Sequence, residues 1–318
     1  MPTIPGALRR LFAVGSIALL ALGGMAGRVS AEQTPTTQTR LILLGTAGGP
    51  SPKQTRSAPA NAVVVNDAIY VVDAGNGVAR QLVLAGLTPR NLRAVFITHH
   101  HSDHNADYGN LLLLAWAAGL RTPVDTYGPP PLVQMTELFL ELNARDIELR
   151  QDEEGRPVLA DLIQPHEIED DGVIYQDENV KVTAFEVIHL GAKPAFGLRF
   201  DTRDRSIVFS GDTSRSENLI KHARGADVLI HEVVSVPAVD ALVARVDPGN
   251  EALKNHILDA HTPLTEVGRI ATEAGVKTLV LTHFVPSDGP DDKAGLWREG
   301  ARQHFSGELI IGEDLMEI

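Results

Sequence analysis

Residues 94–104 read Ala94-Val95-Phe96-Ile97-Thr98-His99-His100-His101-Ser102-Asp103-His104. The five apolar or β-branched residues that begin this stretch predict a buried strand. Side chains alternate along extended backbone, so His99 and His101 point the same way if the strand continues through them. Asp103 and His104 follow at the turn into a predicted helix, where the chain can bring two more ligands to the same place. Four potential ligands within six residues, directly after an apolar strand, therefore predict a metal site.

Three later segments repeat this order of strand and then ligand. Val180–Val187 is followed by His189, Ser206–Ser210 by Asp212, and Thr278–Leu281 by His283. A strand that delivers its ligand just beyond its last residue holds that ligand on a rigid support, and ligands from several strand ends can meet along one edge. Each residue taken alone also fits a structural role, as a capping aspartate or as a histidine bonded to a carbonyl group. Together with the first cluster, they predict one shared site.

The composition restricts the chemistry that such a site can use. The 318 residues include 28 Lys and Arg against 41 Asp and Glu, a formal net charge of −13 at pH 7. That excess of acid argues against a sequence-independent grip on nucleic acid, which needs cationic side chains to neutralise phosphates. The sequence has no cysteine, which excludes disulfides, thiolate nucleophiles and zinc or iron–sulfur sites of the cysteine type. Any metal here must have nitrogen and oxygen ligands.

The first 31 residues have the parts of a secretory signal peptide. Arg9 and Arg10 precede an apolar stretch, Leu11–Leu22, and Val29-Ser30-Ala31 supplies small residues for cleavage. About a dozen uninterrupted apolar residues are too few for a bilayer span, which needs roughly 20. We therefore expect an exported protein, periplasmic or secreted, that uses the Sec or the twin-arginine route and has no stable membrane anchor after cleavage. Removal of three arginines and no acid would take the net charge from −13 to −16.

Residues 32–318 alternate short aliphatic runs with Gly-rich turns and helical stretches, and they contain no long linker. The predicted strands are Leu41–Leu44, Ala62–Asn66, Ile69–Val72, Ala94–Thr98, Val180–Val187, Gly197–Phe200, Ser206–Ser210, Val228–His231 and Thr278–Leu281, and the predicted helices are Val78–Ala85, Asn105–Gly119, Pro131–Ala144, Pro263–Ala274 and Lys293–Phe305. This mixture predicts one domain of the α/β class, with mixed sheet and outer helices. Arg145–Gly172 contains ten acids and three arginines, which predicts a solvated surface excursion.

The ligand motifs resemble those of the metallo-β-lactamase fold superfamily. The superfamily's His-x-His-x-Asp-His motif is matched by His99, His101, Asp103 and His104, and its later motifs are matched by His189, Asp212 and His283. The segments Leu43–Pro50, Val72–Gly75 and Tyr127–Pro129 fit as well, so the resemblance covers nearly all of residues 32–318. It implies an αββα sandwich of two mixed β-sheets with outer helices.

The resemblance also implies how the ligands divide between two metal ions. One ion would take His99, His101 and His189, the second would take Asp103, His104 and His283, and Asp212 would bridge the two. The ions are most often two Zn²⁺, and a donor set of nitrogen and oxygen also suits Mn²⁺ or iron. Asp73 would orient ligands from behind, although an aspartate before Gly75 also fits a simple turn.

Such a site supplies a nucleophile without a serine or cysteine. Two metals about 3.5–4 Å apart hold a bridging hydroxide, and zinc lowers the pKa of bound water to roughly 7. Asp103 is expected to hydrogen-bond that hydroxide while it also binds the metal.

The leaving group still needs a proton, and the candidate donor is His261, which precedes the predicted helix Pro263–Ala274. The ribonuclease Z-like branch of the superfamily has a similar His-bearing loop, and its His-Glu segment resembles His231-Glu232, so Glu232 is expected to keep His261 protonated. A histidine at a helix start also fits a purely structural role.

Enzymes of the ribonuclease Z-like branch differ in the substrate that they hydrolyse. Exported arylsulfatases and small-molecule phosphodiesterases combine a leader, seven ligands and the His-bearing loop, so we expect a small anionic ester as the partner and no nucleic acid. The main alternative is ribonuclease Z, a tRNA 3′ endonuclease. Only 22 residues separate His189 from Asp212, where that enzyme carries its tRNA-gripping arm, and the negative charge and the leader also count against it. A lactonase and a non-catalytic metal-binding protein remain open, as does a homodimer, which is common among similar proteins.

Overall fold

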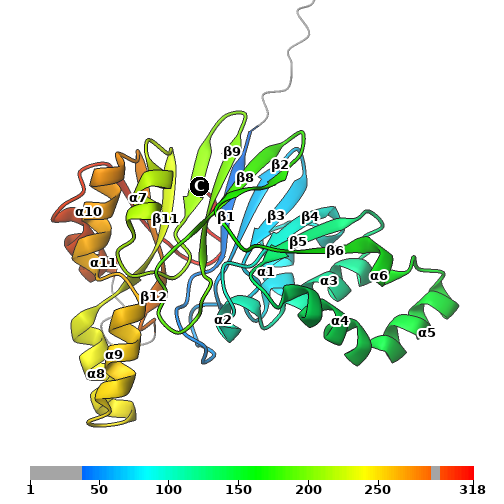
Figure 1. Ribbon diagram of the computed structural model, residues 1–318, viewed down its shortest axis with the longest axis horizontal. Helices are drawn as coiled ribbons and strands as arrows, with labels where there is room; N and C mark the ends of the chain where they lie inside the picture. Colours follow the sequence, from blue (N-terminus) through cyan, green and yellow to red (C-terminus); the bar gives the residue numbers. More distant parts are fainter. Residues whose placement is uncertain (1–37, 288–293) are drawn as a thin grey trace, which may run out of the picture. The chain divides into compact units, whose positions relative to one another are not determined.

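The computed structural model describes residues 38–287 and 294–318, so the predicted leader lies outside the described residues. In the described part, two mixed β-sheets lie between layers of helices (Figure 1). The predicted αββα sandwich is therefore confirmed. None of the described helices combines the length and the apolar character needed to span a membrane.

The first sheet has six strands in the order β1-β2-β3-β4-β5-β6. They are β1 (Arg40–Gly45), β2 (Ala60–Val65), β3 (Ala68–Val72), β4 (Leu92–Phe96), β5 (Val124–Gly128) and β6 (Ile163–Glu167). Strands β1 to β3 are antiparallel neighbours, and β3 to β6 pair in parallel. The helices of this half are α1 (Val78–Leu84), α2 (Ser102–Asn105), α3 (Tyr108–Ala117), α4 (Leu132–Leu142), α5 (Ala144–Glu154) and α6 (Leu159–Leu162), with a 3₁₀ turn at Pro89–Asn91.

The second sheet has seven strands in the order β13-β12-β11-β10-β9-β8-β7. They are β7 (Gly172–Gln176), β8 (Val180–Glu186), β9 (Phe196–Thr202), β10 (Ser206–Phe209), β11 (Val228–Val234), β12 (Thr278–Val285) and β13 (Glu308–Ile311). Strands β7 to β10 are antiparallel, and β10 to β13 are parallel. The helices of this half are α7 (Glu217–Ala223), α8 (Val236–Val246), α9 (Glu251–Ala260), α10 (Leu264–Ala274) and α11 (Ala294–Arg302).

Both faces of the central strands are buried, and the alternation of side chains divides the core into layers. In β1, Leu41 and Leu43 belong to the layer between the sheets, whereas Ile42 and Leu44 pack toward the helices. Strands covered on both faces are apolar at nearly every position, which is why the sequence shows them as continuous aliphatic runs. The two packed sheets give the loops at their common edge a rigid base.

The acidic segment 145–172 is mostly exposed, as predicted, but it is more ordered than a surface excursion. It contains α5, α6 and β6, and β6 closes the first sheet by pairing with β5. Helix α5 has one buried residue, Ile147, so it shows no apolar stripe by which a helix is recognised. Helices α7, α8 and α9 and strands β7 and β13 were also not predicted.

Candidate metal centre

The backbone beyond β4 stays extended as far as the first histidines. The Thr98 amide donates to Asp73 Oδ1 at 2.8 Å, which holds this segment against the end of β3. His99 is fully buried, and its Nε2 lies 3.1 Å from His101 Nδ1. His100 turns the other way, with its Nε2 2.6 Å from a backbone carbonyl of a neighbouring loop. The expected alternation is therefore present, and it brings two ligands to one side.

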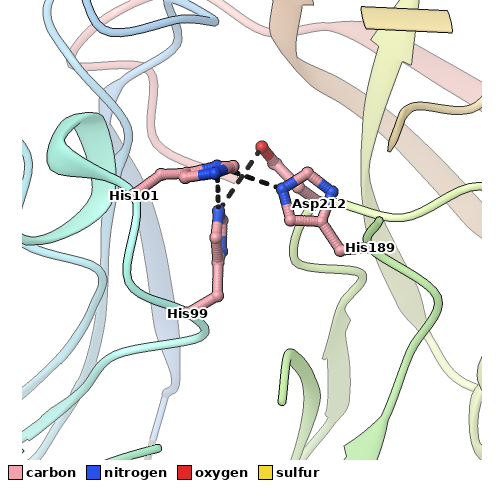
Figure 2. Close-up of side chains that lie close together, drawn as sticks. All are labelled: His99, His101, His189 and Asp212. Atoms are coloured by element: carbon pink, nitrogen blue, oxygen red, sulfur yellow. Dashed lines mark hydrogen bonds and ion pairs between the residues drawn. The ribbon is translucent and has the colours of Figure 1, made fainter. Parts of the chain in front are cut away.

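The first ligand group joins the two sheets (Figure 2). His189, which follows β8, places its Nε2 3.1 Å from His101 Nδ1. Asp212, which follows β10, places its Oδ2 3.8 Å from His99 Nε2. Nitrogen ligands at 2.0–2.1 Å from a tetrahedral zinc lie roughly 3.3 Å from one another. The spacing of the three imidazole nitrogens therefore fits a single ion.

The second ligand group consists of Asp103, His104 and His283. The first two lie on the short helix α2, and His283 lies near the end of β12. The Nε2 atoms of the two histidines are 3.2 Å apart, and Asp103 Oδ2 is 3.4 Å from His283 Nε2. This group has the same spacing as the first and fits a second ion.

Asp212 lies between the two groups. Its Oδ2 is 3.2 Å from His104 Nε2 and 3.2 Å from His283 Nε2, in addition to its approach to the first group. The preceding Gly211 has φ 60°, and a Cβ there would meet the Phe196 carbonyl oxygen at 2.6 Å. Glycine is therefore required at the turn that presents Asp212. All seven side chains proposed from the sequence as metal ligands thus lie in one cluster.

Neighbours outside the cluster fix the imidazole rings. His104 Nδ1 lies 2.8 Å from Asp73 Oδ2, and His189 Nδ1 lies 3.0 Å from the Ala260 carbonyl oxygen. A ring that donates through Nδ1 presents its Nε2 lone pair to the site, and such partners are a regular feature of metal centres. The sequence pointed to Asp73 but gave no signal for the Ala260 carbonyl. Every residue has a backbone carbonyl, so no residue type marks the one that accepts this hydrogen bond.

Burial keeps the histidines of the first group neutral. Desolvation lowers the pKa of His99 and of His101, and it lowers the pKa of His189 to about 4. Neutral imidazoles have a free lone pair at neutral pH, as metal ligation requires.

The second group carries an excess of negative charge. Burial lowers the pKa of His104, but the carboxylates of Asp212, Asp73 and Asp103 outweigh it and raise this pKa well above its usual value. Burial raises the pKa of Asp212, and the facing His283 and His104 outweigh it and hold that pKa well below its usual value. The carboxylates of this group therefore favour positive charge at the place where a cation would bind.

The proposed proton donor and its partner also lie at this site. His261 Nδ1 is 3.2 Å from Glu232 Oε2, and the buried Glu232 accepts the Thr262 amide through Oε1 at 2.5 Å. His261 Nδ1 is also 3.9 Å from Asp212 Oδ2. Burial lowers the pKa of His261, but Glu232 and Asp212 outweigh it and raise it to about 9. His261 is therefore a protonated group held beside the ligand cluster.

Comparisons with known proteins agree with this geometry. Residues 69–284 match the family described as Beta-lactamase superfamily domain. A ribonuclease Z of Mycobacterium bovis is 32% identical over 281 residues, which cover 87% of this chain and 97% of that protein. The chain belongs to the metallo-β-lactamase superfamily, in its ribonuclease Z-like branch. It is a metal-dependent hydrolase, and its clustered His and Asp side chains indicate a divalent metal.

Two solved structures share the fold. The metallo-β-lactamase fold protein YhfI of Bacillus subtilis is 24% identical, with a TM-score of 0.63 and coverage of 88% of this chain and 98% of that one. The short form of human tRNase Z is 23% identical, with a TM-score of 0.63 and the same coverage of both chains.

The prediction of a small sulfate or phosphate ester as substrate, with no nucleic acid as partner, was wrong. The finding that overturns it is the match to a protein named ribonuclease Z over 97% of that protein's length. The short connection between His189 and Asp212 did not exclude this branch, since the relative aligns over 97% of its own length. The net charge misled because it sums the whole surface, whereas a substrate meets the local field of the cleft.

A cavity of about 650 Å³ opens on the solvent side of the cluster. His101, His189 and His261 line its floor, and residues of α8 and α9 line one wall. No helix was predicted between His231 and Pro263, so the contribution of α8 and α9 to this cavity was not expected from the sequence.

Proposed function

We propose that this protein is a metal-dependent endoribonuclease of the ribonuclease Z type, which cleaves a phosphodiester bond on the 3′ side of a tRNA precursor. The observation that carries the proposal is the 32% identity to a ribonuclease Z over 97% of that protein. The cluster of seven ligand side chains with a protonated histidine beside it supports the same chemistry.

Two Zn²⁺ are the proposed cofactors. His99, His101 and His189 would hold one ion, Asp103, His104 and His283 would hold the other, and Asp212 would contact both. The absence of cysteine leaves only nitrogen and oxygen donors, which suit zinc and also Mn²⁺ or iron. When bound, the ions polarise the phosphate and lower the pKa of water.

The side chains of this protein supply the remaining steps. Asp103 orients the attacking water toward phosphorus, and the proton that this water loses passes to solvent. The new P–O bond forms as the bond to the leaving oxygen breaks, and that oxygen needs a proton. His261 holds this proton on Nε2, because its Nδ1 lies against Glu232 and the ring lines the cavity. After transfer, His261 takes a proton from solvent.

The test is incubation of the metal-loaded protein with a tRNA precursor that carries a 3′ extension, followed by mapping of the product ends. Cleavage at the junction between the tRNA and its extension is expected. Bis-p-nitrophenyl phosphate serves as a control substrate for general phosphodiester hydrolysis. Hydrolysis of this control without any cleavage of RNA would refute the proposal.

A further inference from the structure

The helices α8 and α9 form an antiparallel pair beyond the ends of β11 and β12 (Figure 1). We call this pair, with its connection at residues 247–250, the α8–α9 hairpin. Val239 and Val243 pack with Val234 and Val285 in a small core of their own, separate from the main layers. The hairpin is therefore anchored on the second sheet while its other side remains free to face the cavity.

The side of the hairpin that faces the cavity is largely apolar. Four of its side chains line the cavity: Leu242, Val246, Leu253 and Ile257. Val246 is 63% exposed, so it contributes little to the protein's own packing. Leu253 and Ile257 also pack against the hairpin's own core, so Val246 is the side chain of the four that is left exposed. Exposed apolar surface at the rim of a cleft marks a binding surface.

Two cations line the same cavity. Arg245 comes from α8, and Lys53 comes from the loop after β1. Among the described residues, neither forms an ion pair with a carboxylate, and Lys53 Nζ contacts only Ser51 Oγ at 2.9 Å. The carboxylates of Asp103 and Asp212, which belong to the ligand cluster, line the same cavity. In a chain with a net charge of −13, Arg245 and Lys53 give the rest of this lining a local site for anions.

The hairpin is continuous with the reacting groups. The ring of His256 lies 6.5 Å from that of His101, measured between centroids. One turn later, the Ala260 carbonyl meets His189, and His261 is the next residue. A group bound against α9 would therefore lie beside the bond that is cleaved.

We propose that the α8–α9 hairpin binds one nucleobase next to the scissile bond, while Arg245 and Lys53 hold the neighbouring phosphates. This inference rests on the proposed ribonuclease function. A cavity of about 650 Å³ is within the range that holds one small ligand, so a single nucleotide enters it and the rest of the RNA stays outside. Apolar contact with the base and charge complementarity with the backbone explain the mixed lining.

The test is a cycle that combines a protein variant with an altered RNA. In the protein, Val246→Ser removes apolar surface from the cavity without disturbing the core, because this side chain is mostly exposed. In the RNA, an abasic nucleotide replaces the residue on the 3′ or the 5′ side of the cleaved bond. Groups in contact give non-additive losses. Val246→Ser should lower kcat/KM about fivefold on normal RNA and have almost no effect on one of the two abasic RNAs.

Arg245→Ala tests the phosphate contact, and its matched control is Arg203→Ala, an exposed arginine in the turn between β9 and β10. Arg245→Ala should raise KM for RNA and make it less dependent on salt, whereas the control should change neither. Equal losses from Val246→Ser on normal RNA and on both abasic RNAs would overturn the inference and leave the ribonuclease function standing. Failure of the unaltered protein to cleave RNA would overturn both.

Discussion

The orientation of His104 depends on Asp73, which accepts its Nδ1 proton from behind the ligand cluster. Asp73→Asn should reduce metal affinity or activity by about 10–100-fold, because the ring loses the partner that fixes its tautomer. Metal titration of the purified variant measures the effect. The matched control is Asp125→Asn, since Asp125 pairs with His166 on the exposed surface at 3.0 Å. Equal metal affinity in the two variants would contradict this role for Asp73.

The proton on His261 predicts a pH dependence. Because its pKa is raised to about 9, the donor form is complete at neutral pH and is lost as the pH rises through that value. Cleavage of RNA should therefore decline above about pH 9, and His261→Ala should lower the rate about 100-fold or more. Bis-p-nitrophenyl phosphate should be much less affected, because its leaving group needs no proton.

Glu232→Gln provides the second arm of that experiment. Removal of the carboxylate that raises the pKa of His261 should move the decline to lower pH. A pH profile identical to that of the unaltered protein would show that Glu232 does not set the protonation of His261.

At the scale of elements, the sequence was informative where the pattern is local. The apolar run before His99 predicted β4. The alternation of side chains along extended backbone predicted that His99 and His101 point the same way. Helices α8 and α9 were not predicted, although Val239, Leu242, Val243 and Val246 recur at helical spacing in α8. Their apolar residues divide between a small core and an open cavity. Strand β6 was also not predicted, because it is an edge strand with only one buried residue and therefore lacks an apolar run.

The contact between α10 and α11 predicts a stability effect. A Cβ at Gly268 would lie 2.3 Å from the Ala301 carbonyl oxygen, a backbone atom of the facing helix. Gly268→Ala should lower the free energy of unfolding by about 1–3 kcal/mol, because overpacking outweighs the gain in helix propensity. Denaturant unfolding measures it.

The control for this effect is Gly295→Ala in α11, where no described atom lies within 4 Å of the added Cβ. Gly295 is the second residue of α11, so the substitution should raise the free energy of unfolding by less than about 0.5 kcal/mol. Destabilisation of the same size in both variants would contradict the packing explanation.

At the scale of the whole molecule, the leader remains a prediction. If residues 1–31 are a signal peptide, the protein recovered from outside the cytoplasm should begin at Glu32, and N-terminal sequencing would establish this. Export would restrict the proposed function to RNA outside the cytoplasm. A chain that keeps Met1–Ala31 inside the cell would contradict the signal and would fit a precursor tRNA substrate directly.

Metal removal should affect the entire fold. Ions that bind the folded chain and not the unfolded one stabilise it by about 4 kcal/mol at a concentration 1,000 times Kd. Addition of a chelator should therefore lower Tm, and added Zn²⁺ should restore it. An unchanged Tm after proven loss of metal would contradict a cluster that depends on cations to balance its carboxylates.

The ligands come from both sheets, and this has a consequence for the order of assembly. His99 and His101 supply two donors for one ion, and Asp103 and His104 supply two for the other, so this hexapeptide alone completes neither coordination sphere. The missing donors arrive from positions as distant as His283, 179 residues beyond His104. Tight capture of cations must therefore be a late event in folding, after the two halves of the polypeptide have closed on one another.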